Sequence, residues 1–315
     1  GYVALAQNTY GCDNVAIGNA ALQTNTTGCN NIALGINSLF ANTSGFNNIA
    51  IGCNSLYNNT VGYDNIAIGR CALCANTNGN FNVALGYGAL KCNNATCLNV
   101  AIGFQPLAAN TVGYDNLAIG WAPLFKNISG CSNTSVGINS LYNNTSGNNN
   151  VAIGSGALYG NRTGSNNIAI GYQTLFNQQA GNNNLALGYN ALYSNTTGNN
   201  NIAIGCQSLY SNTSGFNNIA IGCQTMCGNT IGCFNVGIGD RVLIFNTSGR
   251  HNVAIGYGAL QFNSSGSCSV AIGYGALTLN TSGINNVAVG FQAMYSNSTG
   301  MGNVAVGLSA IQWNK

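Results

Sequence analysis

Charged residues are scarce in this sequence. Lys and Arg together number 7 and acidic residues number 4, so charged side chains make up 3% of the 315 residues, whereas an ordinary soluble domain has about 25%. The basic residues are spread along the chain and form no stripe, which argues against nucleic acid as a partner.

The residues of acid–base and metal chemistry are also few. The sequence has one histidine, His251, and its four aspartates lie far apart. Asp13 and Asp64 are 51 residues from one another, and the same interval separates Asp64 from Asp115, a spacing unsuited to the paired carboxylates of a glycosidase. We therefore predict that the chain is no enzyme, with no catalytic residue, no metal site and no cofactor.

Long apolar runs are missing as well. Asn and Gly interrupt each apolar stretch after a few residues, so no segment reaches the roughly 20 residues of a membrane-spanning helix. The 44 glycines do not recur at every third position as in collagen. Rows of Val, Ile and Leu accompany them, which predicts an ordered, β-rich chain.

What the sequence does have is one repeat of fixed length. A glycine recurs every 17 residues from Gly1 to Gly307, which gives eighteen full repeats and nine further residues. We number the repeat from this glycine as places 1 to 17. A short fixed period predicts a single β-solenoid over residues 1–315 with about 18.5 coils. No capping repeat is visible at either end, so we expect a segment of a longer chain or fibre.

Three aliphatic rows indicate how each coil folds. Place 5 is nearly always Leu, places 15 and 17 are Val, Ile or Leu except at Thr134, and place 16 is Ala except at Ser135 and Gly237. We expect two short strands: one with places 15 and 17 facing inward, and one with Leu inward at place 5 and places 2, 4 and 6 outward. Turns are expected at places 1–3 and at places 8–11, which often read NTSG.

Asn occupies place 8 in all repeats but one, where Gln178 replaces it, and place 14 in all but one, where Ser269 replaces it. Stacked at the spacing of β-strands, each amide can bond to the next. We therefore predict two asparagine ladders.

The stretch N-V-A-I-G-x-x-A, as in Asn252 to Ala259, resembles the head repeats of trimeric autotransporter adhesins. It is also similar to glycine- and asparagine-rich repeats of fibrous extracellular and viral proteins. The resemblance implies a left-handed parallel β-roll that is displayed at a surface and serves for adhesion or as a shaft.

Thirteen cysteines without a paired C-x-x-C metal motif indicate disulfides and an oxidising, extracellular or surface-exposed location. Cysteines 17 residues apart lie one coil apart, so Cys12 with Cys29 and Cys206 with Cys223 are the strongest predicted pairs. Cys92 with Cys97 and Cys227 with Cys233 are alternatives within one coil. Bonds of Cys74 to Cys92 and of Cys53 to Cys71 compete with them.

The sequon N-x-S/T is frequent, and N-glycosylation of several sequons is a second prediction. The alternative is that Asn serves the turn and the hydroxyl is incidental. The candidate asparagines are Asn25, Asn42, Asn58, Asn94, Asn127, Asn144, Asn161, Asn195, Asn212, Asn246, Asn263, Asn280 and Asn297.

Of the 28 aromatic residues, 18 stand at places 2 and 6, on the expected outward face. We predict an assembly or glycan-binding stripe. The alternative is that Tyr and Phe stand here only because they favour strands. Its representatives are Tyr142, Tyr159, Tyr172, Phe176, Tyr189, Tyr193 and Tyr210.

The predicted function is therefore structural: a shaft or subunit of an extracellular fibre or surface spike that associates with copies of itself. An adhesin head that binds a surface or glycan ligand is the second hypothesis. An ice-binding solenoid is the third, because regular hydroxyl rows on a β-solenoid can order water, and places 9 and 10 often hold Thr or Ser.

Overall fold

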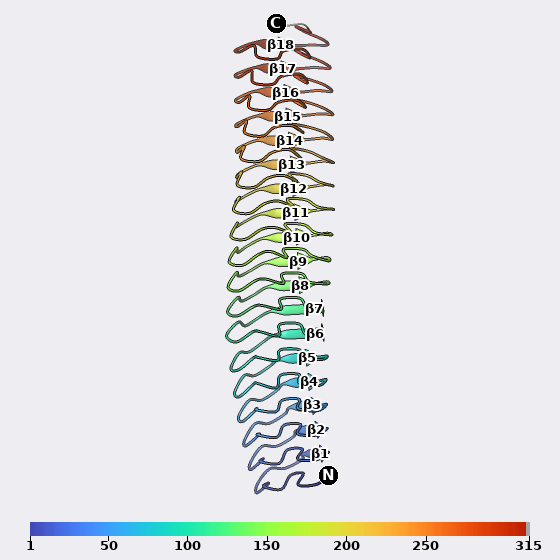
Figure 1. Cartoon of the computed structure of the whole chain (residues 1–315), viewed down its shortest axis with the longest axis vertical. Helices are drawn as coiled ribbons and strands as arrows, with labels where there is room; N and C mark the ends of the chain where they lie inside the picture. Colours follow the sequence, from blue (N-terminus) through green and yellow to red (C-terminus); the bar gives the residue numbers. More distant parts are fainter. Residues whose placement is uncertain (313–315) are drawn as a thin grey trace. The chain divides into compact units, whose positions relative to one another are not determined.

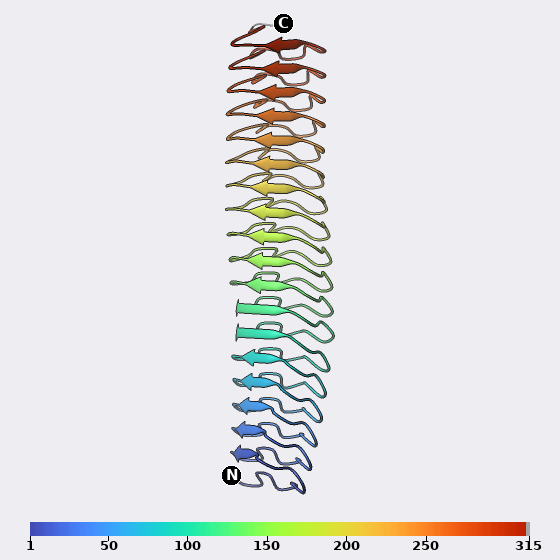
Figure 2. The same ribbon diagram turned by 180° about the vertical axis from the view of Figure 1, so that it is seen from behind.

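A computed structural model describes residues 1–312 of this chain. Two compact units make up the chain, Gly1–Gly156 and Ala157–Lys315. Each unit is a parallel β-solenoid with one three- to five-residue strand per 17-residue coil, and the described residues contain no helix (Figure 1). From behind, the strands within each unit all point the same way (Figure 2). The predicted all-β solenoid of 17-residue coils is thus confirmed for each unit.

The strands fall at places 15–17 of each coil. In the first unit they are β1 (Val15–Ile17), β2 (Ile32–Leu34), β3 (Ile49–Ile51), β4 (Ile66–Ile68), β5 (Val83–Leu85), β6 (Val100–Phe104), β7 (Leu117–Trp121), β8 (Thr134–Val136) and β9 (Val151–Ile153). In the second they are β10 (Ile168–Ile170), β11 (Leu185–Leu187), β12 (Ile202–Ile204), β13 (Ile219–Ile221), β14 (Val236–Ile238), β15 (Val253–Ile255), β16 (Val270–Ile272), β17 (Val287–Val289) and β18 (Val304–Val306). Successive strands pair in register, as Ala203 does with Ala220.

The interior differs from the prediction at places 15 and 17. In nearly every strand the middle Ala is fully buried, whereas the aliphatic residues on either side are partly exposed, as in Ile219–Ile221. Alternation along the strand puts places 15 and 17 on the outer face once Ala faces inward. The prediction that they face inward was wrong.

The predicted second strand is also absent from the coils over residues 1–312. Places 2–7 form successive turns, with places 3 and 5 in the left-handed region, as at Gln207 (φ 53°) and Leu209 (φ 49°). The bends turn both place 4 and place 5 inward, so Ser208 and Leu209 are both fully buried. Left-handed backbone is unfavourable for these residue types, but here each coil bonds to the next, for example from Leu209 N to the Thr225 carbonyl at 3.0 Å.

Close approach of neighbouring coils explains the recurring glycines. A Cβ atom on Gly205 would lie 2.4 Å from the carbonyl oxygen of Gly222 in the next coil, and φ at Gly205 is 128°. At place 11, a Cβ atom on Gly215 would lie 2.3 Å from Oδ1 of Asn212. Both places therefore exclude a side chain unless the backbone moves.

The two asparagine ladders are confirmed. At place 8, Nδ2 of Asn212 donates to Oδ1 of Asn195 at 2.8 Å and to the Gly215 carbonyl at 3.0 Å. At place 14, both the backbone N–H and Nδ2 of Asn218 donate to Oδ1 of Asn201 at 3.1 Å. These amides are fully buried, so the ladders supply the partners that buried polar groups need.

Candidate functional surface

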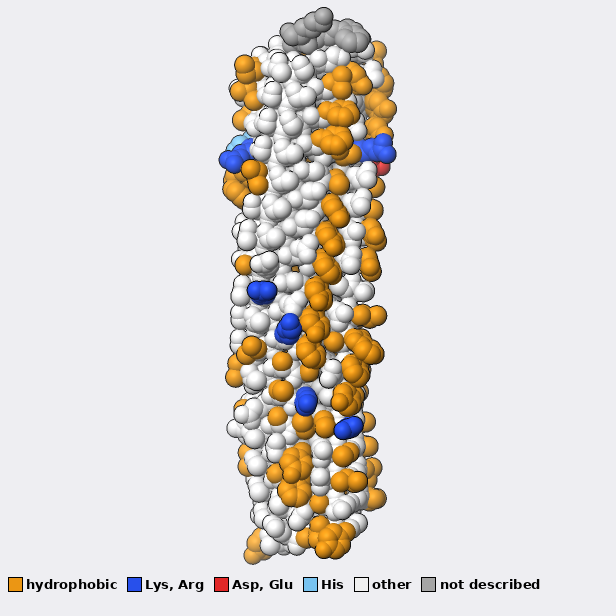
Figure 3. Space-filling view, in the orientation of Figure 1, with side chains coloured by type: hydrophobic (Ala, Val, Ile, Leu, Met, Phe, Trp, Pro, Cys, Tyr) orange, Lys and Arg blue, Asp and Glu red, His pale blue; other side chains and the backbone are white. Residues whose placement is uncertain are grey.

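The outer face of each sheet is a regular aliphatic surface. The eighteen strands carry two outward side chains each at places 15 and 17, 36 in all, and every one is Val, Ile or Leu except Thr134. In β6 and β7 the strand extends to place 2, where Phe104 and Trp121 continue the outward alternation. The space-filling view has the orientation of Figure 1, so it shows the side of each unit away from the strands that face the viewer in Figure 2; hydrophobic side chains form rows there too, with a few Lys and Arg side chains beside them (Figure 3). We call places 15 and 17 of all coils the outer sheet face.

The predicted aromatic stripe resolves into two separate columns of stacked rings. Place 6 contributes one column, in which Phe176 stacks on Tyr193 at 5.3 Å and Tyr193 on Tyr210 at 5.2 Å between ring centroids. Place 2 contributes the other, where Tyr172 and Tyr189 stack at 5.6 Å. Tyr159 and Phe176 also stack at place 6, as do Tyr142 and Phe125.

The arrangement of the stripe departs from the prediction at place 4. That residue is buried rather than exposed between the two aromatic rows, because the chain turns at places 3 and 5 instead of running as a strand. The residues that separate the columns at the surface are those of place 3. Within a column each ring covers a face of its neighbour, so a fully uncovered ring face occurs only where a column ends.

All thirteen cysteines are free thiols in the structure, so the disulfides remain predictions. The sulfur atoms of Cys12 and Cys29 lie 2.7 Å apart, and this contact raises the pKa of Cys12 to about 11. Burial, followed by the proximity of Cys206, raises the pKa of both Cys223 and Cys227.

The remaining candidates have neighbouring thiols both in their own coil and in an adjacent coil. After burial, the thiols that raise the pKa of Cys227 are those of Cys206 and Cys223. Cys233 is buried. The Cys92 thiol, in the coil after Cys74, contributes to the raised pKa of Cys74 after burial and Cys71, and the sulfur of Cys97 accepts from the backbone N–H of Asn80 at 3.4 Å. Over residues 1–312, no three side chains of the His, Cys, Asp and Glu types gather as a metal site requires.

The candidate sequons divide by burial. Eleven have their asparagine at place 8, where the side-chain amide is fully buried in a ladder: Asn25, Asn42, Asn127, Asn144, Asn161, Asn195, Asn212, Asn246, Asn263, Asn280 and Asn297. A glycan needs one hydrogen of that amide and a path to solvent, which the folded coil does not provide. Asn58 and Asn94, at other places, have exposed side chains.

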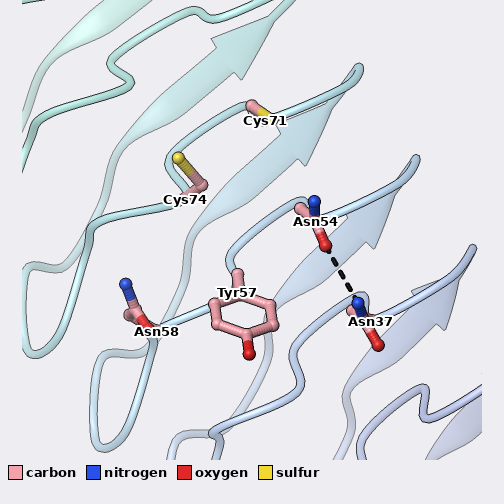
Figure 4. Close-up of a pocket in the computed structure, with 6 residues that line it drawn as sticks. All are labelled: Asn37, Asn54, Tyr57, Asn58, Cys71 and Cys74. Carbon is pink, nitrogen blue, oxygen red and sulfur yellow. Dashed lines mark hydrogen bonds between the residues drawn. The ribbon is translucent and has the colours of Figure 1, made fainter.

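A hollow that sequence reasoning missed lies at the end of one aromatic column. Phe40 stacks on Tyr57 at 5.1 Å, but the next residue at place 6 is Cys74, so the second face of the Tyr57 ring has no stacked ring. The resulting hollow has a volume of about 330 Å³ and is also lined by Asn37, Asn54, Asn58 and Cys71. Figure 4 shows the Tyr57 ring face-on with these side chains around it. The signal in the sequence was the change from aromatic to small residue at place 6.

Comparisons with known proteins gave no match to a family model, to a curated protein or to a solved structure. Within residues 1–312 the structure holds no helix with the length and hydropathy that a membrane crossing requires.

Proposed function

We propose that this chain is a non-enzymatic structural protein that associates with copies of itself through the outer sheet face, as a shaft or subunit of an extracellular fibre or surface spike. The observation that carries the proposal is the composition of that face. Nine strands about 4.8 Å apart and about 10 Å long cover about 400 Å² in each unit, well within the range of the largest apolar patches on ordinary monomers, many of which are interaction sites.

Strand propensity alone does not explain these side chains. Thr also favours strands and is polar, so an exposed sheet with no partner would be expected to hold Thr at many outward places. Thr occurs at only one of the 36 outward places. An outer face kept aliphatic at the other 35 outward places fits a surface that is covered in the working assembly. The cysteine content supports the extracellular location.

Charge placed on the outer sheet face tests the proposal. The double variant Ile204→Lys, Ile238→Lys changes place 17 in alternate coils, so the new charges are two coils apart. The native chain should form oligomers or filaments in a concentration series by sedimentation velocity and electron microscopy, and the variant should stay monomeric, because burying an unpaired ammonium is costly.

The matched control is Thr197→Lys, Ile231→Lys, which adds the same charges to the same two coils at place 10, where both residues are exposed. This variant should assemble like the native chain, and circular dichroism should be the same for all three proteins. A native chain that remains monomeric at high concentration, or a place 17 variant that assembles unchanged, contradicts the proposal.

The place 9 hydroxyls bear on the ice-binding alternative. Thr213 Oγ1 donates to the Thr230 carbonyl at 3.1 Å, and Thr230 Oγ1 donates to the Thr247 carbonyl at 2.8 Å. Donors used between coils are not available to a water lattice, so the structural proposal is preferred over ice binding. The adhesin alternative depends on a local site, of which the Tyr57 hollow is the strongest instance.

A further inference from the structure

We propose that the hollow at Tyr57 binds a neutral carbohydrate. This inference is independent of assembly through the outer sheet face, since it depends on side chains at places 3, 6 and 7 of the coils between Asn37 and Cys74 (Figure 4).

The first argument is the uncovered aromatic ring. One face of Tyr57 is stacked on Phe40, with the ring planes 7° apart. On the other side Cys74 takes the place of a ring, and its sulfur instead lies 3.5 Å from the Lys91 carbonyl. An aromatic face beside a hollow is a platform for the C–H face of a sugar ring.

The second argument is the unused hydrogen-bonding capacity of the amides. Asn37 Nδ2 donates to Asn54 Oδ1 at 3.2 Å, which fixes the orientation of both side chains. Within the described chain, neither Nδ2 of Asn54 nor the side-chain amide of Asn58 takes part in a hydrogen bond. Amides offer both donors and acceptors, which is what a set of sugar hydroxyls requires.

The third argument is the absence of charge. No charged side chain lines the hollow, and Arg70, next to Cys71 in the chain, lies over the ring of Tyr87 with 6.0 Å between its guanidinium carbon and the ring centroid. Burial, with the nearby Cys71 second, raises the pKa of Cys74 to about 11, so this thiol is neutral at physiological pH. The Lys91 ammonium, in the coil after Cys74, acts to lower the pKa of that thiol but does not line the hollow. A phosphate, carboxylate or zwitterion would therefore find no counter-charge in the lining, and a purely apolar ligand would leave the amides unpaired.

The volume of the hollow also fits a carbohydrate. A volume of about 330 Å³ falls at the small end of the usual range for ligand pockets, enough for one or two sugar rings. A comparable hollow of about 350 Å³ lies where the column of Tyr210 ends at Cys227, but apolar residues such as Ile244 and Phe245 line it and Gln224 is its one amide. That second hollow lacks the polar partners and serves as an internal control.

The test uses the full chain, produced in a host that does not glycosylate, so that Asn58 is unmodified. The probes are methyl glycosides of glucose, galactose, mannose and N-acetylglucosamine with their neutral oligomers, together with sulfated oligosaccharides as charged probes. Saturation-transfer NMR and calorimetry should find at least one neutral probe that binds with a Kd of about 1 mM or tighter, and should find no preference for the charged probes.

Filling the hollow is the decisive variant. Cys74→Tyr extends the aromatic column by one ring, a residue type that place 6 accepts in many coils, and should weaken binding at least tenfold. Cys227→Tyr makes the same change at the end of the other column and should leave binding unchanged. Tyr57→Leu removes the platform and should also weaken binding at least tenfold, with Tyr193→Leu, inside a stacked column, as its control.

The proposal is overturned if no neutral probe binds, if only charged probes bind, or if binding survives both Cys74→Tyr and Tyr57→Leu in folded protein. Equal losses in Cys74→Tyr and Cys227→Tyr would also overturn it, because the effect would then follow ring addition in general and not the hollow at Tyr57.

Discussion

Removal of one amide from the place 8 ladder tests what holds the coils together. Asn212 is fully buried, donates to Asn195 Oδ1 and the Gly215 carbonyl at 2.8 and 3.0 Å, and accepts from Asn229 Nδ2 at 2.7 Å. Asn212→Ala removes three bonds worth about 1 kcal/mol each and leaves Asn195 Oδ1 buried without its donor, so we expect a loss of about 3–4 kcal/mol. The Gly215 carbonyl keeps a second donor, Asn201 Nδ2 at 2.8 Å, which limits the loss.

Native-state hydrogen exchange is the appropriate assay, because a repeat array opens locally and need not unfold in one step. Amides in the coils around residue 212 should exchange more than about 100-fold faster in the variant, since each 1.4 kcal/mol is about tenfold. Asn177→Ala, an exposed place 7 residue, is the control and should change stability by less than about 0.5 kcal/mol. If the two variants behave alike, the ladder does not stabilise the coils and the reasoning fails.

Three further predictions concern single places of the repeat. Ser269→Asn should raise stability by about 1 kcal/mol in urea unfolding, because an amide there can donate to the Gly283 carbonyl as other place 14 residues do in their coils; no gain would contradict this. Burial raises the pKa of Cys74 from 9.0 to about 11, so at pH 8 its alkylation should be about 100-fold slower than that of an ordinary thiol and should recover in denaturant; fast labelling of folded protein would refute it. In a glycosylating host, glycopeptide mass spectrometry should find sugar on sequons outside place 8, such as Asn58 and Asn94, and on none at place 8, because the place 8 amides are buried; an occupied place 8 sequon in folded protein would contradict the ladder.

The features that were predicted from sequence are those that stacking enforces at every coil. Leu at place 5 faces the interior, as at Leu209 and Leu243, and a residue in that position touches its copies above and below, which keeps its type constant. The buried ladders follow the same logic, since an amide such as Asn212 needs an amide one coil away. The residue types that recur at a fixed place of the repeat therefore predicted the length of the coil, the stacking of the coils and the buried polar rows.

The features that were missed depend on backbone angles and on which face of a short strand is inward. Nothing in the residue types at Gln207 and Leu209 indicates a left-handed backbone, which is normally found at Gly, Asn or Asp. In a strand of three residues, the outer two side chains share one face and the middle one has the other. The pattern I-A-I is therefore compatible with Ile on the inner face or on the outer face. The rule that larger aliphatics face the core then selected the wrong side of the strand.

A single coil shows why the interior takes Ala and not a larger residue at place 16. In β14 that residue is Gly237, and a Cβ atom there would lie 2.9 Å from Thr225 Cγ2, 3.0 Å from Met226 Cε and 3.3 Å from Val242 Cγ1. Thr225 and Val242 are larger than the usual Ala at place 4, and Met226 is longer than the usual Leu at place 5 and reaches further across the interior. The coil compensates for these side chains by losing a methyl group at place 16. An interior this narrow leaves no room for the side chains of places 15 and 17.

Compensation of this kind makes a coupled prediction. Gly237→Ala alone should destabilise the chain by about 1–3 kcal/mol through overpacking. In the background Thr225→Ala, Met226→Leu, which restores the common residues of places 4 and 5, the same change should cost less than about 0.5 kcal/mol or become stabilising, because Ala in a strand is preferred to Gly. A double-mutant cycle by urea unfolding measures the difference. Additive effects would mean that the interior relaxes freely, and the volume argument for outward-facing aliphatic residues would then lose its support.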